Sequence, residues 1–142
     1  MKKNNKPYGQ ARCLEFAFTS DFEYFALLKN QFLGKIKSES LWHRLNEVSG
    51  SLNISVVPDS ANELIFDVKV NCRVAYDSPG NRNEIDALVG RALILRYKSG
   101  GGLIKMLGTT SAPLYLKVEQ PEGLEGYNCI FEGMMLTREI FV

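Results

Sequence analysis

The chain of 142 residues is the size of one ordinary domain, and its 45% hydrophobic and 23% charged residues are typical of a globular protein rather than a disordered one. Seventeen basic and sixteen acidic residues leave a net charge of +1, which argues against nucleic acid as a partner and against an anionic membrane surface. No run approaches the roughly 20 apolar residues that a membrane-spanning helix needs, so we expect no membrane contact.

The cysteine and histidine content argues against a metal centre. Cys13, Cys72 and Cys129 are far apart in the sequence, no Cys-x-x-Cys occurs, and one histidine cannot complete a common zinc set. Each cysteine lies in an apolar run, which predicts buried free thiols and a reducing compartment.

The first third of the chain predicts a flexible arm followed by helices. Residues 1–10 are polar and basic, as expected of a fraying terminus, and residues 20–50 form the predicted helical part. Ser20 and Glu23 have the spacing of a capping box. A first helix is predicted from an apolar stripe at spacings of three, four and four, and a second, shorter one is predicted to close at Gly50. The stripe consists of Phe25, Leu28, Phe32 and Ile36.

From residue 51 the apolar residues recur at every second position, which predicts a β-rich part over residues 51–142. A strand from residue 64 to 76 at about 3.3 Å per residue would be roughly 40 Å long, about twice the usual length. It is therefore expected to bend at a bulge or to project as part of a long hairpin. Its clearest signal is one face of apolar residues, namely Leu64, Phe66, Val68, Val70, Cys72, Val74 and Tyr76.

Further alternation and turn residues predict the remaining elements. A helical turn is expected at 83–88, and three glycines at 100–102 are expected to join two strands as a hairpin. The apolar end, 140–142, is expected to lie in a sheet or against a partner. The sequence thus predicts a single domain over 1–142 of the α+β class, mainly antiparallel β in a sandwich or barrel-like sheet, with one or two N-terminal helices.

No motif indicates chemistry, so we predict no catalytic, cofactor-binding or metal-binding residue. His43 lacks a recognisable nucleophile and orienting acid, although a Cys-His pair is neither supported nor excluded by spacing. The glycines at 100–102 lead into a strand-like run rather than a helix, unlike a phosphate-binding loop. The acids and amides between Asp77 and Asp86 do not follow the order of a calcium loop.

The segment from Glu63 to Val142 resembles a known group of proteins in the order of its motifs. The long alternating strand is followed by Asn-Glu-Ile-Asp-Ala-Leu-Val-Gly at 83–90 and Arg-Ala-Leu-Ile-Leu at 91–95. Then come Met-Leu-Gly-Thr-Thr at 106–110, Ala-Pro-Leu-Tyr-Leu at 112–116, Gly-Tyr-Asn at 126–128 and a glycine-containing last strand. In this it is similar to small virion-associated structural proteins of tailed bacteriophages and prophages. The resemblance implies a non-enzymatic tail or connector protein, made in the host cytoplasm and then part of the virion tail or neck.

Such a protein is expected to form a homo-oligomeric ring and to contact other virion structural proteins, by strand addition and apolar contacts. The candidate assembly surface comprises Leu64, Phe66, Tyr76, Ile140, Phe141 and Val142. The alternative hypothesis is a small ligand-binding or nucleic-acid-binding β-barrel that uses Arg91, Arg96 and Tyr97 on an open sheet face.

Overall fold

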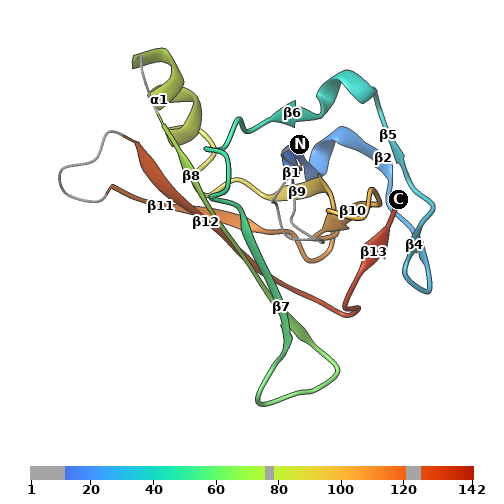
Figure 1. The fold of residues 1–142 in the computed structure, drawn as a ribbon. Helices are drawn as coiled ribbons and strands as arrows, with labels where there is room; N and C mark the ends of the chain where they lie inside the picture. Colours follow the sequence, from blue (N-terminus) through green and yellow to red (C-terminus); the bar gives the residue numbers. More distant parts are fainter. Residues whose placement is uncertain (1–11, 76–78, 121–125) are drawn as a thin grey trace, which may run out of the picture.

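The computed structural model describes residues 12–75, 79–120 and 126–142, and it shows two main sheets that enclose one hydrophobic core (Figure 1). Nearly all strand pairs are antiparallel, so the predicted β-rich, antiparallel fold is confirmed.

The four-stranded sheet has the order β11-β12-β8-β7 and contains the two longest strands. In β8 the side chains of Val68, Val70, Cys72 and Val74 are buried, as the alternation predicts. Burial of each valine stabilises the fold by roughly 1.5–3 kcal/mol. The strands are β7 (Asn53–Pro58), β8 (Phe66–Val74), β11 (Tyr115–Glu119) and β12 (Tyr127–Met135).

The seven-stranded sheet has the order β3-β4-β13-β10-β9-β1-β6, and its central strands β9 and β10 form the hairpin that the glycine turn predicts. Leu93, Ile94 and Leu95 of β9 are fully buried. The strands are β1 (Arg12–Phe18), β3 (Leu27–Leu28), β4 (Gln31–Phe32), β6 (His43–Arg44), β9 (Leu93–Lys98), β10 (Ile104–Leu107) and β13 (Ile140–Phe141).

The two sheets are joined along one side and separate along the other. At the join, Leu93 and Leu114 exchange two backbone hydrogen bonds of 2.9 Å. On the opposite side β7 is the outermost strand of its sheet and is not paired with any described strand of the other sheet. The fold is therefore a sandwich that is closed at β11 and open at β7.

The predicted N-terminal helices are wrong. Residues 20–50 hold short strands and two 3₁₀ turns, Thr19–Asp21 and Glu39–Leu41, with β2 (Phe22–Tyr24) paired to β5 (Lys35–Ile36). The predicted capping box does not form, because the Asp21 carboxylate instead accepts from the backbone amide of Phe18 at 3.0 Å and closes the first of these turns.

Local chemistry explains why this segment prefers hairpins to helices. Lys29 has a φ of 58°, a left-handed conformation that turns β3 back along β4. A Cβ on Gly34 would lie 2.6 Å from the carbonyl oxygen of Tyr24, so the close approach of these strands requires glycine. Aromatic residues also lose side-chain freedom in helices, and here Phe22 packs edge-on against Trp42 at 5.8 Å.

One α-helix, α1 (Pro79–Asp86), occurs within the described residues. It begins earlier than the predicted turn at 83–88, with a proline in its first position, where a missing amide hydrogen is harmless. The side chains of Ile85 and Leu88, at and just after the C-terminal end of α1, are buried in the core.

Candidate assembly surface

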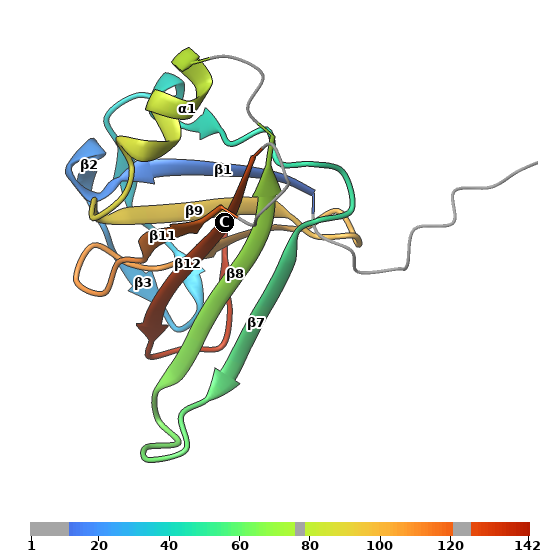
Figure 2. The ribbon, with the colours of Figure 1, turned by 90° about the vertical axis from the view of Figure 1, so that its left-hand side faces the viewer.

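The loop that joins β7 to β8, residues 59–65, projects beyond the rest of the four-stranded sheet (Figures 1 and 2). Its shape is fixed by its own side chains. The Asp59 carboxylate accepts from the backbone amides of Ala61 and Asn62, both at 3.1 Å. The Asn62 side-chain oxygen accepts from the Leu64 amide at 3.0 Å. Because the turn is already ordered, binding through it would lose little conformational entropy.

This end of the molecule exposes several large apolar side chains. Leu64 at the loop is 78% exposed, and Leu136, in the connection after β12, is 82% exposed. Val57 and Met134 lie directly on either side of Asp67 in the strand register and are also exposed. Exposed apolar residues of this size, gathered at one end of a sheet, are typical of contact surfaces.

The structure separates the described members of the six-residue assembly surface that the sequence predicts. Leu64 is at the projecting loop. Phe66 is half-buried, and the Arg138 guanidinium carbon lies 5.5 Å from the centre of its ring. Tyr76 lies outside the described residues.

The C-terminal strand is part of the fold rather than a free tail. Ile140 is fully buried in the core, and β13 pairs with β10 on one side and with β4 on the other. Phe141 is half-buried, with the Lys105 ammonium 5.5 Å from its ring centre, and Val142 is 49% exposed. The predicted surface is thus reduced to Leu64 and, at the other end, to parts of Phe141 and Val142.

A groove of about 410 Å³ runs along the unpaired side of β7, between this strand and β10 and β13. Its apolar lining from β7 includes Ile54 and Val56, which point toward the core side but stay only half-buried because no strand among the described residues covers them. Tyr97 and Lys105 line the facing wall, and burial raises the pKa of the Tyr97 phenol. An unpaired strand edge beside half-buried apolar side chains is the arrangement that accepts a further strand. The types of the residues that line the groove do not predict it, because the groove forms where the two sheets separate.

Two acids approach each other at the base of the projecting loop. Partial burial and a hydrogen bond with Asp59 raise the pKa of the Asp67 carboxyl. A carboxyl group whose pKa is higher in the folded state adds stability below its unfolded pKa of about 3.9, and that stability is lost as the pH rises through the folded pKa. At neutral pH the two carboxylates therefore repel and destabilise the hairpin.

Replacement of Asp67 by Asn is expected to raise the melting temperature at pH 7, because the amide removes this repulsion and still hydrogen-bonds to Asp59. At pH 3, below the usual pKa of an aspartate, the raised pKa keeps the Asp67 carboxyl of the wild type protonated, so the variant and the wild type should melt together. Thermal unfolding followed by circular dichroism at the two pH values measures this. Equal shifts at both pH values would contradict the assigned repulsion.

The alternative hypothesis of a ligand-binding or nucleic-acid-binding barrel depends on Arg91, Arg96 and Tyr97, and these three residues lie in different surroundings. On β9, Arg96 and Tyr97 point to opposite faces, Tyr97 toward the groove and Arg96 toward Trp42. The Arg91 guanidinium lies 4.2 Å from the ring centre of Phe18. The structure therefore does not place Arg91, Arg96 and Tyr97 on a common binding face.

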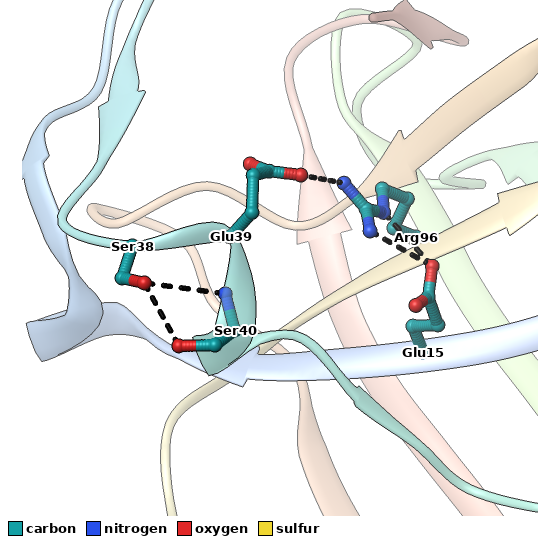
Figure 3. Close-up of polar contacts among 5 residues, drawn as sticks. All are labelled: Glu15, Ser38, Glu39, Ser40 and Arg96. Carbon is teal, nitrogen blue, oxygen red and sulfur yellow. Dashed lines mark hydrogen bonds and ion pairs between the residues drawn. The ribbon is translucent and has the colours of Figure 1, made fainter.

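Arg96 is held in an ion-pair cluster (Figure 3). Its guanidinium donates to Glu15 at 3.0 Å and to Glu39 at 3.2 Å, and it stacks 4.3 Å from the ring centre of Trp42. The turn that carries Glu39 is itself fixed, since the Ser40 amide donates to the Ser38 hydroxyl at 3.3 Å. Two carboxylates already neutralise this cation, which makes it a poor site for a phosphate.

Replacement of Glu15 by Gln is expected to lower the free energy of unfolding by about 1–2 kcal/mol, because it weakens a charged hydrogen bond in a site that is largely shielded from water. The matched change of Glu39 to Gln should cost about 0–0.5 kcal/mol, because this side chain is 74% exposed. Urea unfolding of the two variants measures the difference. Equal losses would show that the shielding of Glu15 has no energetic consequence.

His43 does not form a recognisable catalytic group with a cysteine. It is exposed on the edge strand β6, beside Phe16, in a groove of about 540 Å³ whose described lining contains no cysteine.

Cys72 and Cys129 are buried and face each other across β8 and β12. The hydrogen bond to Cys129, together with burial, raises the pKa of the Cys72 thiol and keeps it protonated. The side chain of Cys13 lies outside the described ones. Among the described residues no group of three histidine, cysteine or acidic side chains could hold a metal ion.

Comparison of the chain with protein-family models, with curated proteins and with solved structures found no match. No helix within the described residues is long and apolar enough to cross a membrane.

Proposed function

We propose that this protein is a non-enzymatic structural subunit of a bacteriophage tail or head–tail connector, which assembles into a homo-oligomeric ring with other virion proteins as neighbours. It would be made in the host cytoplasm and become part of the tail or neck of the virion. The sequence resemblance over 63–142 supports the choice of particle. The outer edge of β7, beside a groove into which its half-buried Ile54 and Val56 side chains point, is the observation that carries the assembly mechanism.

In this mechanism a strand of a neighbouring subunit pairs with β7 and covers the half-buried side chains of Ile54 and Val56. Backbone hydrogen bonds to an edge strand supply affinity, and alternate side chains that enter the groove supply specificity. The projecting loop at 59–65 extends the same hairpin and gives it reach toward the neighbour (Figure 2).

A lysine on the groove side of β7 tests this mechanism, because natural edge strands use inward-pointing charges to block pairing. The Val56→Lys variant is expected to remain folded, with its ammonium in the groove, and to lose assembly as measured by light scattering. The control is Ser55→Lys, on the same strand but on its exposed opposite face, which should assemble like the wild type. Equal assembly of Val56→Lys and wild type would rule out strand addition at β7.

A further inference from the structure

The projecting hairpin end carries a net negative charge. Between residues 57 and 67 there are three acids, Asp59, Glu63 and Asp67, and no basic residue. Glu63 is exposed, and it is next to Leu64 in the loop, whose side chain is 78% exposed. We call residues 57–67 the acidic tip. It presents two exposed apolar side chains, Leu64 and Val57, together with three acidic residues on a hairpin end whose turn is already ordered.

The segment that forms the short strands β2 to β5 has the opposite character. Residues 22–37, which we call the basic segment, contain Lys29, Lys35 and Lys37 and one acid, Glu23. Glu23 pairs with Lys35 at 3.1 Å. Among the described residues Lys29 and Lys37 form no ion pair, and both are exposed, so two positive charges remain available to a partner.

The basic segment also exposes apolar side chains between its lysines. Tyr24, Leu28 and Leu33 are 56%, 64% and 51% exposed. The segment includes β3, which is the outermost strand of the seven-stranded sheet, just as β7 beside the acidic tip is the outermost strand of its own sheet. Both surfaces therefore combine exposed apolar residues, unbalanced charge and an outermost strand.

The two surfaces lie apart on one molecule, the acidic tip below the four-stranded sheet and the basic segment at the side near β4 (Figure 1). They are complementary in charge and both have exposed apolar groups. We propose that the acidic tip of one copy docks on the basic segment of the next copy, with Leu64 covered between Leu28 and Leu33 and with Glu63 near Lys29, the lysine beside Leu28 in the turn between β3 and β4. This inference rests on the proposed homo-oligomer and adds a second contact to the strand pairing proposed at β7.

A contact between two different surfaces of the same chain is head-to-tail, and it closes into a ring or grows into a filament. Charge complementarity of this kind directs the register of association and makes the contact sensitive to ionic strength. An interface that places like charges together is strongly disfavoured, which makes charge exchange a decisive test.

The test uses the full chain and two charge-reversed proteins, Glu63→Lys and Lys29→Glu. Each protein alone is expected to show a dissociation constant about tenfold or more above that of the wild type, by sedimentation velocity at low salt. In an equimolar mixture both kinds of contact again join opposite charges, because each tip meets the segment of the other protein. The mixture is therefore expected to assemble at concentrations at which neither protein assembles alone.

Matched controls separate this contact from general effects of charge or hydrophobicity. Glu119→Lys reverses an exposed acid at the end of β11 and should leave the dissociation constant unchanged. Leu64→Ser should weaken association about tenfold, whereas Leu103→Ser, at another exposed turn, should not. Circular dichroism of every variant checks that it is folded.

Restoration of assembly in the mixture supports the head-to-tail contact. If the wild type assembles but the reversed proteins assemble equally well alone, or if their mixture fails, the contact is overturned while the proposed homo-oligomer stands. A wild type that stays monomeric at every concentration overturns both.

Discussion

Replacement of Ile140 by Asp is expected to unfold the protein or to lower its free energy of unfolding by about 4 kcal/mol or more. Ile140 is fully buried, and its strand β13 lies between β10 and β4. An ionised carboxylate there would have no partner, and a neutral one would still lose the burial of the isoleucine side chain. Thermal unfolding monitored by circular dichroism measures the loss.

The control is Val142→Asp, two residues further on. Val142 is 49% exposed, so its replacement should change the free energy of unfolding by no more than about 0.5 kcal/mol. The pair distinguishes a C-terminal strand that belongs to the core from a tail that serves assembly. A folded Ile140→Asp protein that fails only to assemble would contradict the structural role assigned to this strand.

Replacement of Gly133 by Val is expected to disrupt the join between the two sheets. Gly133 lies on the inward face of β12, and a Cβ there would lie 2.4 Å from the Leu114 side chain and 2.7 Å from the Pro113 carbonyl oxygen. Leu114 fills the space that the glycine leaves and also forms the hydrogen-bonded join to Leu93. The backbone contact cannot be relieved by a change of rotamer, so β12 and the segment before β11 must move apart.

The smaller change Gly133→Ala already introduces this Cβ and should cost about 1–3 kcal/mol, the usual range for overpacking, while the valine should cost more. Met134→Val serves as control, because Met134 is 53% exposed on the outer face of the same strand and should tolerate a β-branched residue. Urea unfolding gives the three values. Wild-type stability in Gly133→Ala would show that Leu114 and Pro113 can yield without cost.

The second half of the fold could be predicted because its strands have one buried and one exposed face. In β8 the alternation alone identifies Val68, Val70 and Val74 as core residues, and β12 opposite supplies Phe131 in the same layer. A period of two is unambiguous over nine residues, and the glycine run before β10 marks its hairpin.

The N-terminal part was predicted wrongly because a helical stripe and a series of very short strands can have the same spacing. Phe25, Phe32 and Ile36 do pack against the core, but from a local hairpin in which β3 pairs with β4 and β2 pairs with β5. The deciding signals were Gly34, which permits close strand contact, and the left-handed turn at Lys29. Neither is visible in the apolar periodicity.

The candidate assembly surface was predictable only in part. Leu64 belongs to the long alternating run, but β8 begins only at Phe66, which leaves Leu64 exposed in the preceding loop. The groove beside β7 depends on the separation of two sheets, and the basic segment depends on three lysines spread over the short strands. These features depend on how the sheets and short strands are arranged in three dimensions, which the local sequence pattern does not predict.

The most direct test of the proposed function is the molar mass of the wild-type protein by light scattering on a size-exclusion column, over a hundredfold range of concentration. The proposal predicts a discrete oligomer, or a monomer that associates as its concentration rises, with weaker association at high salt. A strict monomer of 16.0 kDa at every concentration and salt would contradict self-assembly.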